Sequence, residues 1–350
     1  MLLSALVFSF VAIGLSAWLT SRFMLPDSRF HILDHPNERS LHTRPTPRTG
    51  GIAIVTAVMI VGSVAAICIT PEWQRLMYLA VAILLVAVTS FLDDRWRLAF
   101  GYRMFVHLMA AAVLVFGSFS LRAVTLVGHS VALVPGIGVL ASVLYIAWMV
   151  NLYNFMDGMD GFAGGMAVVG FGVFAVFGVW HGQWLFATLN LIVSASAAGF
   201  LLFNFPPARI FMGDTGSSTL GLLAAAFSLW GARDGIFPFW IALLVFSPFI
   251  VDATVTLLRR IVRGERFWQA HKTHYYQRLV QVGWSHGKTV RYEYVLMFFC
   301  ALSAVLAAPQ SATIQLWVAG AWIAVYGLLA LLVVRFERGD VGAKSRRRRV

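Results

Sequence analysis

The sequence predicts an all-α polytopic membrane protein that crosses the bilayer about eleven times. Of its 350 residues, 59% are hydrophobic and only 12% are charged, and the mean hydropathy is +0.79. Apolar runs of membrane-crossing length recur along the chain, since about twenty helical residues cross the hydrocarbon core. The expected spans are 2–20, 50–70, 76–92, 104–121, 136–150, 162–180, 184–203, 215–232, 236–258, 292–307 and 313–334.

The distribution of positive charge sets the orientation of these spans. Cytoplasmic loops of membrane proteins carry an excess of Lys and Arg. The basic end of the chain, Arg346 to Arg349, is therefore predicted to be cytoplasmic, and an odd number of crossings then places the N-terminus outside. This orientation leaves only Arg75, Arg122 and Arg233 of the 27 Lys and Arg residues on the outer side. The charge distribution thus supports both the orientation and the number of spans.

We expect residues 1–335 to form a single membrane domain and residues 336–350 to form a basic cytoplasmic tail. The predicted cytoplasmic loops are 21–49, 93–103, 151–161, 204–214 and 259–291. The net charge of +12 follows from this topology. Because the basic residues lie in short loops beside the membrane, anionic lipid headgroups and phosphorylated substrates are the expected partners, and nucleic acid is not.

Acidic residues are scarce, and a third of them gather at one membrane face. Five of the 15 fall at predicted cytoplasmic helix ends: Asp93, Asp94, Asp157, Asp160 and Asp214. Carboxylates near hydrocarbon are costly, so several at one face predict a cation or a phosphate chemistry that compensates their charge. For each residue taken singly, the alternative is a helix cap or a partner for a loop arginine.

The stretch NLYNFMDGMDGFAGG, residues 151–165, places Asn151, Asn154, Asp157 and Asp160 at every third position. Each step of three residues turns the side-chain direction by about 60° around a straight α-helix, so the first and last of these side chains would point to opposite sides and the four would not converge. The glycines among them allow a turn, and we therefore predict a loop over 151–161. Asn and Asp oxygens are hard ligands that suit Mg²⁺ or Mn²⁺ bridging to phosphates, which favours phosphoryl transfer.

Two basic loops reach the same predicted face, HPNERSLHTRPTPRTGG and RRIVRGERFWQAHKTHYYQRL. Their Arg and Lys side chains can clamp phosphates and leave metal coordination to the carboxylates. The positive-inside rule alone would explain most of these charges, but not the interleaved His271 and His274. Asp252 lies deeper in a predicted span, and its role stays open between a structural pair and a part in the site.

Four motifs, in this order and on this topology, carry a resemblance to a known family: FLDDRWR, NLYNFMDGMDGFAGG, NFPPARIFMGDTGSS and HKTHYYQRL. Together they resemble the polyprenyl-phosphate N-acetylhexosamine-1-phosphate transferases of glycosyltransferase family 4. The likeness runs from Asp34 to Leu279. It implies transfer of a sugar 1-phosphate from a UDP-sugar to undecaprenyl phosphate, release of UMP, and a need for Mg²⁺. It also implies an active site on the cytoplasmic face of a bacterial inner membrane.

The resemblance further implies a role for each motif residue. Asp214 would be the chief metal ligand with Asn154 and Asp157 beside it, and Asp157 would also act in catalysis. Asp93 and Asp94 would act at the lipid phosphate. The remaining implied contacts are Asn204 and Asp160 at the uracil nucleotide, His271 and His274 at phosphates, and Arg39, His42 and Arg48 in the first cytoplasmic loop. Whether the protein forms a homodimer stays open.

The mechanism, the donor sugar and one alternative class stay open from the sequence. The acceptor phosphate could attack directly, or an aspartyl-phosphate intermediate could form. Residues 271–276 lack the adjacent histidines of the phospho-N-acetylmuramoyl-pentapeptide transferases, which are the alternative within the family. This favours the branch that initiates O-antigen or other surface polysaccharides with GlcNAc or a 6-deoxy relative such as FucNAc or QuiNAc. The alternative of another class is an ion-coupled or lipid transporter, although transporters usually place such groups at the membrane midplane within repeated halves.

Overall fold

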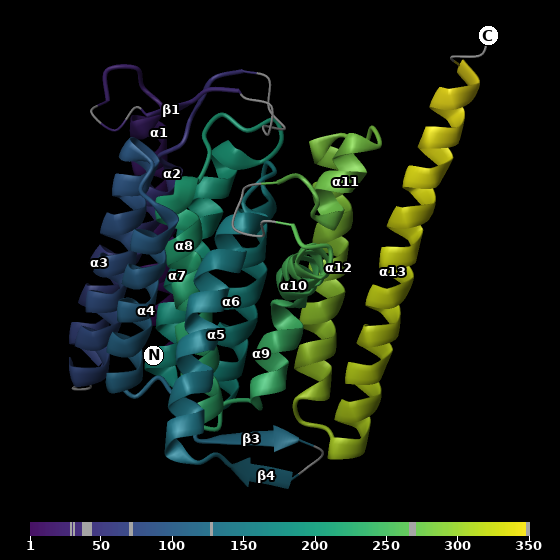
Figure 1. Cartoon of the computed structure of the whole chain (residues 1–350). Coiled ribbons are helices and arrows are strands. Elements are labelled where there is room, and N and C mark those ends of the chain that lie inside the picture. Colours follow the sequence, from purple (N-terminus) through teal and green to yellow (C-terminus); the bar gives the residue numbers. More distant parts are fainter. Residues whose placement is uncertain are drawn as a thin grey trace.

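A computed structural model shows a bundle of long helices that run roughly side by side (Figure 1). It describes residues 1–28, 30, 32–36, 44–69, 73–126, 129–265 and 271–347. The helices are α1 (Leu2–Phe23), α2 (Gly50–Ile69), α3 (Trp73–Trp96), α4 (Phe100–Phe116), α5 (Pro135–Met156), α6 (Phe162–Trp180), α7 (Trp184–Asn204), α8 (Gly213–Arg233), α9 (Phe239–Val245), α10 (Ser247–Val262), α11 (Tyr275–Gln281), α12 (His286–Ala307) and α13 (Ala312–Arg347). Two short antiparallel hairpins join them, β1 (Leu33–Asp34) with β2 (Thr46–Pro47), and β3 (Ala123–Leu126) with β4 (His129–Ala132).

Each of the eleven predicted spans coincides with a helix or, for 236–258, with a pair of helices. Within the described residues, eight helices are long and apolar enough to cross a membrane, and a ninth crossing results if α9 and α10 form one broken span, bent by 83°. The prediction of a multi-pass membrane protein is confirmed. The count of eleven stays a prediction, because α4 is short and the first third of α8, GDTGSST, is polar.

Helix α8 forms the centre of the bundle. Its residues from Thr215 to Gly231 are all buried, and it packs against α2, α3 and α5. Aromatic rings fill the space around its second half and meet edge to face or stacked; among the fully buried ones are Phe171, Phe174, Phe177, Phe186, Phe227 and Phe246. The polar first turns of α8 therefore begin inside a rigid apolar frame.

Small residues allow the first turns of α2 and α8 to touch backbone to backbone. A Cβ atom on Gly51 would stand 2.2 Å from the amide nitrogen of Gly216. The Gly51 N–H donates to the carbonyl of Met212 at 2.8 Å, and the Gly50 N–H donates to that of Phe211 at 3.0 Å. Because only glycine permits this approach, the motifs RTGG and GDTGSS meet although they are far apart in sequence.

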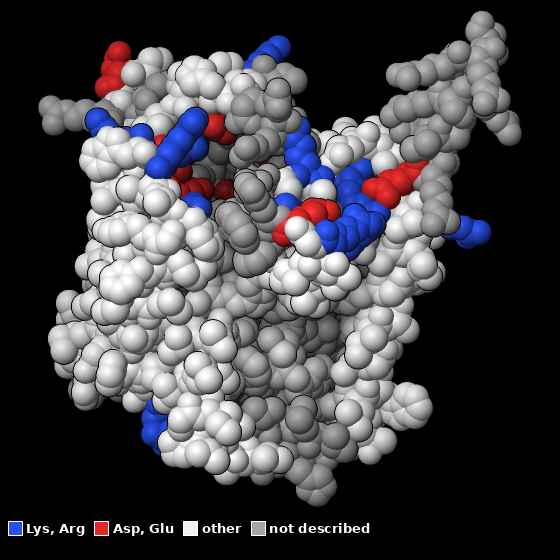
Figure 2. All heavy atoms as spheres, viewed as in Figure 1, with Lys and Arg blue, Asp and Glu red and all other residues white. Residues whose placement is uncertain are grey.

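Charged residues concentrate at one end of the bundle. Figure 2 shows a hollow at the end that carries β1 and α11, with acidic side chains in its depth and Lys and Arg around its rim. The start of α1 and the end of α13 lie toward opposite ends of the bundle (Figure 1). Which end faces the cytoplasm rests on the distribution of Lys and Arg and stays a prediction.

Candidate active site

The second aspartate of the FLDDRWR motif holds the start of α8. The Asp94 carboxylate accepts hydrogen bonds from the Asp214 N–H at 3.1 Å and from the N–H and hydroxyl of Thr215 at 3.0 and 2.9 Å. Arg48 completes the arrangement, with its Nη2 3.1 Å from Asp94 Oδ1 and 2.6 Å from the Asp94 carbonyl oxygen. A carboxylate at a helix N-terminus is favoured by the unpaired N–H groups and by the helix dipole. The motif at the end of α3 thereby fixes the motif at the start of α8.

The first aspartate of the motif faces a different neighbour. Asp93 accepts a hydrogen bond from the Leu98 N–H at 2.6 Å and another from Arg103 at 2.6 Å. The same Arg103 nitrogen lies 3.5 Å from Asp214 Oδ2, so one guanidinium links the two carboxylates. Among the described residues, the Nε atoms of Arg48 and Arg103 are buried without a hydrogen-bond partner. The two side chains are partly exposed elsewhere, at 23% and 32%, and their guanidinium groups suit the oxygen atoms of a phosphate.

The loop predicted over 151–161 is shorter than expected, and that part of the prediction is wrong. Helix α5 continues to Met156, so Asn151 and Asn154 lie on it and the loop covers 157–161. Asn154 donates to the hydroxyl of Ser218 on α8 at 3.3 Å, while Asn151 turns to the Ala147 carbonyl within its own helix at 2.7 Å. The two asparagines thus contact different partners, although residues three apart are neighbours on a helix surface.

Asp157 also belongs to this acidic group. Burial raises the pKa of the Asp157 carboxyl well above its ordinary value, and the negative charges of Asp214, Asp94 and Asp160 raise it further. Like charges gathered in a partly enclosed site favour the protonated form of one of them unless a cation compensates them. The site therefore has an excess of negative charge that a bound cation would relieve.

Asp160 and Asn204 tie neighbouring loops together. Asp160 accepts from the Ala208 N–H at 3.0 Å and lies 3.3 Å from His286 Nδ1. Burial raises the pKa of Asp160, but the hydrogen bonds from His286 and Ala208 outweigh burial and leave it below the ordinary value. Asn204 accepts from the Gly161 N–H at 2.9 Å and donates to the Ile210 carbonyl at 2.8 Å. Both side chains thus shape the rim of the site, and their predicted contacts with the uracil nucleotide stay predictions.

The histidine segment is anchored by Asp252, whose role was open from the sequence. The Asp252 carboxylate accepts from the N–H groups of Tyr275 and Tyr276 at 2.9 and 3.2 Å, and its Oδ1 lies 3.2 Å from His274 Nδ1. It therefore caps α11 and holds a buried histidine at the same time. His271 is half-buried, and its ring centroid lies 4.8 Å from that of His274.

Arg39 and His42 lie outside the described residues. Four further residues contact predicted site residues although no sequence pattern pointed to them: Arg103, Thr215, Ser218 and His286. Arg103 and His286 stand in predicted cytoplasmic loops, and Thr215 and Ser218 belong to the GDTGSS motif. Their positions were visible in the sequence, but nothing in their spacing indicated which carboxylate or asparagine each would meet.

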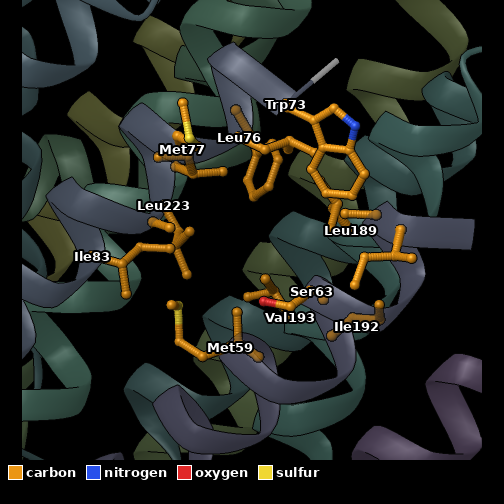
Figure 3. A pocket seen from close by; sticks show the side chains of 17 residues that line it. Met59, Ser63, Trp73, Leu76, Met77, Ile83, Leu189, Ile192, Val193 and Leu223 are labelled. Atoms are coloured by element: carbon orange, nitrogen blue, oxygen red, sulfur yellow. The ribbon is translucent and has the colours of Figure 1, made fainter. Parts of the chain in front are cut away.

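An apolar pocket of about 210 Å³ lies between α2, α3, α7 and α8, and it is not part of this site. Figure 3 shows it enclosed by Met59, Trp73, Ile83 and Leu223, with Ser63 contributing a hydroxyl. On α3 its lining ends at Ile83, about 15 Å of helix rise before Asp93. A pocket of this composition cannot stabilise the charges of a nucleotide diphosphate.

The residues present fit a Mg²⁺ ion that is completed by substrate. In the described part of the chain, no group of three His, Cys, Asp or Glu side chains is arranged to hold a metal ion by itself. Mg²⁺ seldom uses an all-protein cage and usually combines one or two carboxylates with water and substrate phosphates. Asp214 and Asp157, with Asn154 nearby, would supply the oxygen ligands, and a bound cation would offset the repulsion among the carboxylates that raises the pKa of Asp157.

Comparison with known proteins assigns this site to a family. The sequence model of glycosyl transferase family 4 matches residues 76–232, which include the first three motifs up to GDTGSS. A probable undecaprenyl-phosphate N-acetylglucosaminyl 1-phosphate transferase of Bacillus subtilis is 32% identical over 86% of this chain and 82% of its own length. The chain belongs to glycosyl transferase family 4.

Two further relatives are similar to this chain at lower identity. The decaprenyl-phosphate N-acetylglucosaminephosphotransferase of Mycolicibacterium smegmatis is 29% identical over 91% of this chain and 85% of its own length. The phospho-N-acetylmuramoyl-pentapeptide-transferase of Shouchella clausii is 27% identical over 70% and 78%. The resemblance predicted from the four motifs is thereby confirmed.

Proposed function

We propose that the protein transfers an N-acetylhexosamine 1-phosphate from a UDP-sugar to undecaprenyl phosphate, releases UMP, and so initiates a surface polysaccharide such as O-antigen. The observation that carries this proposal is the convergence of four carboxylates with two arginines at the charged end of the bundle. UDP-GlcNAc is the preferred donor, with its 6-deoxy relatives next, because two of the relatives named above act on N-acetylglucosamine 1-phosphate. The active site would face the cytoplasm of a bacterial inner membrane.

The reaction forms one phosphorus–oxygen bond and breaks another. An oxygen of the lipid phosphate attacks the phosphorus that carries the sugar, and the bond from this phosphorus to the UMP oxygen breaks. A phosphate monoester is mostly dianionic at neutral pH, since its second pKa is about 6, so little deprotonation is needed before the attack. Direct attack is therefore our preferred mechanism over a covalent aspartyl-phosphate.

The protein residues would supply positioning and charge, the terms that dominate phosphoryl transfer. Arg48 and Arg103 would attract phosphate oxygens with their partly exposed guanidinium groups. His271 and His274 would bind the diphosphate. Mg²⁺, or Mn²⁺ in its place, would stabilise the charge on the diphosphate when bound to Asp214, Asp157 and Asn154.

The two adjacent aspartates would divide the work at the acceptor. Asp94 accepts three hydrogen bonds from the first turn of α8 and forms an ion pair with Arg48, so its carboxylate has little capacity left to bind substrate. Asp93 accepts one backbone N–H and shares Arg103 with Asp214. We therefore assign the contact with the lipid phosphate to Asp93, through Arg103, and a positioning role to Asp94.

The test is transfer of label from tritiated UDP-GlcNAc to undecaprenyl phosphate by the purified protein in detergent with Mg²⁺. We expect butanol-extractable label and stoichiometric UMP, and we expect both to disappear with EDTA and in Asp214→Asn. If UDP-GlcNAc is inert, UDP-FucNAc, UDP-QuiNAc and UDP-MurNAc-pentapeptide are tried next. A folded protein that transfers none of these sugars would contradict the proposal and favour the transporter.

A further inference from the structure

The last helix of the chain touches the bundle sparingly, yet its half at the charged end of the bundle holds the histidine segment. Only 6% of the apolar span of α13 is buried, and Figure 1 shows the helix standing at the edge of the bundle next to α12. At the end of this span, Glu337 accepts two hydrogen bonds from Arg278 of α11, at 2.6 Å from Nε and 2.5 Å from Nη2. A bidentate pair of this kind fixes orientation as well as distance.

Arg278 is built into its place. Its side chain is only 8% exposed, and its guanidinium lies 4.7 Å from the ring centre of Tyr275 in the same short helix. Its Nη1 is buried and has no hydrogen-bond partner among the described residues. Removing Glu337 would therefore leave a largely desolvated positive charge within the segment that begins at His274.

Helix α11 is thus held at two points by two different helices. Asp252 of α10 binds the N–H groups at its start, and Glu337 of α13 binds Arg278 in its last turn. An isolated helix of seven residues is not stable by itself, because helix nucleation is costly. The position of His271 and His274 consequently depends on tertiary contacts, which are these two attachments together with the buried ring of Tyr276 against Phe162.

We propose that Glu337 is a positioning residue for the transfer reaction, acting through Arg278 to hold the histidine segment over the site. This inference rests on the proposed function, in which these histidines bind the diphosphate. It assigns a functional role to α13, a helix that lies beyond the residues matched by the family model.

The remaining contacts of α13 allow the Arg278–Glu337 pair to be removed while the helix stays docked on the bundle. Tyr326 lies 2.6 Å from the hydroxyl of Ser247, and Gln315 accepts from the indole N–H of Trp240 at 2.9 Å. Phe336, next to Glu337, also packs against Trp284, with ring centroids 5.8 Å apart. Because the contacts of Tyr326 and Gln315 lie farther from Glu337 along α13, loss of the ion pair should loosen α11 without detaching α13.

The experiment compares wild type with Glu337→Gln, Arg278→Glu and the exchanged pair Arg278→Glu/Glu337→Arg. The matched control is Asp234→Asn, which breaks another bidentate pair, with Arg75 at 2.6 and 3.2 Å, at the other end of the bundle. Hydrogen–deuterium exchange of peptides covering 271–281 is measured on each full-length protein, together with kcat and KM for the UDP-sugar.

We expect exchange over 271–281 to accelerate about tenfold in both single variants, and kcat to fall by a similar factor with a smaller change in KM. The exchanged pair should be more active and more protected than either single variant, although Arg259 near Glu337 will limit the recovery. Asp234→Asn should leave the 271–281 peptides unchanged.

Two results would overturn the inference. One is unchanged exchange over 271–281 in Glu337→Gln. The other is faster exchange there with unaltered kcat, which would make the pair structural only. If the wild-type protein transfers no sugar, the proposed function fails, whereas the exchange data still report whether the pair holds α11.

Discussion

Asp94→Asn should destabilise the protein far more than Asp93→Asn, although both should abolish transfer. An asparagine offers one acceptor oxygen where Asp94 uses two, so either the Asp214 N–H or the Thr215 donors would face an amide NH₂. Leaving a buried donor unpaired costs about 1–3 kcal/mol, and the cap contributes about 1 kcal/mol. With the loss of charge beside Arg48, we expect a total of about 3 kcal/mol.

The Asp93→Asn variant should keep more of the hydrogen bonds around residue 93 than Asp94→Asn keeps around residue 94. The amide oxygen can still accept from the Leu98 N–H, and Arg103, whose side chain is 32% exposed, keeps its contact with Asp214. The loss of one partly exposed ion pair costs about 1 kcal/mol.

The assay is thermal unfolding in detergent with EDTA, read by a thiol-reactive dye, because Cys300 is buried and reacts when the core opens. Cys68 is exposed on α2, and Cys68→Ser removes it so that Cys300 alone reports unfolding. Thr215→Val, which removes only the hydroxyl donor, should fall between the two variants. Equal midpoints for Asp93→Asn and Asp94→Asn would refute the assignment of Asp94 as the anchor of α8.

The pKa of Asp157 is raised in the folded protein, so in EDTA its contribution to stability is complete below its ordinary pKa of 3.8 and is lost as pH rises through the raised pKa. Asp157→Asn should therefore have a higher melting temperature than wild type at pH 8 and the same melting temperature at pH 4. Added Mg²⁺ should stabilise wild type alone. Gly51→Ala should lower expression and melting temperature because its Cβ would stand 2.2 Å from the Gly216 nitrogen, whereas Gly14→Ala, with open space around it, should be neutral. Asp252→Asn should accelerate hydrogen exchange over 271–281 by at least as much as Glu337→Gln, since it removes charge from the cap of α11.

The fold and the location of the site could be predicted because both depend on patterns that are local in sequence. Apolar runs set the helices, and their ends agree with the structure within a few residues for most spans. The clustering of carboxylates at one end followed from topology, since residues at the ends of antiparallel spans on one face must gather there. The charged end seen in Figure 2 is the result.

The details of the site depend on contacts that no local pattern encodes. Glycines within 151–165 indicated a turn but not its start, because a helix can continue through polar residues when they find partners, as Asn154 does with Ser218. Likewise, nothing near Asp252 indicates that it caps a helix more than twenty residues later, and nothing near Glu337 indicates Arg278. Such pairings arise only once the helices are packed.

The adjacency of Asp93 and Asp94 has a geometric reason that limits how their roles can be tested. Successive residues on an α-helix point about 100° apart, so Asp94 faces the start of α8 while Asp93 faces the start of α4. The pair thereby connects three helices around Asp214, with Arg48 on one side and Arg103 on the other. Because a shift of either aspartate also moves Asp214, loss of activity cannot distinguish a residue that acts on the substrate from one that places the metal ligand. A measurement of stability can distinguish them, since of the two aspartates only Asp94 forms hydrogen bonds with the backbone of α8.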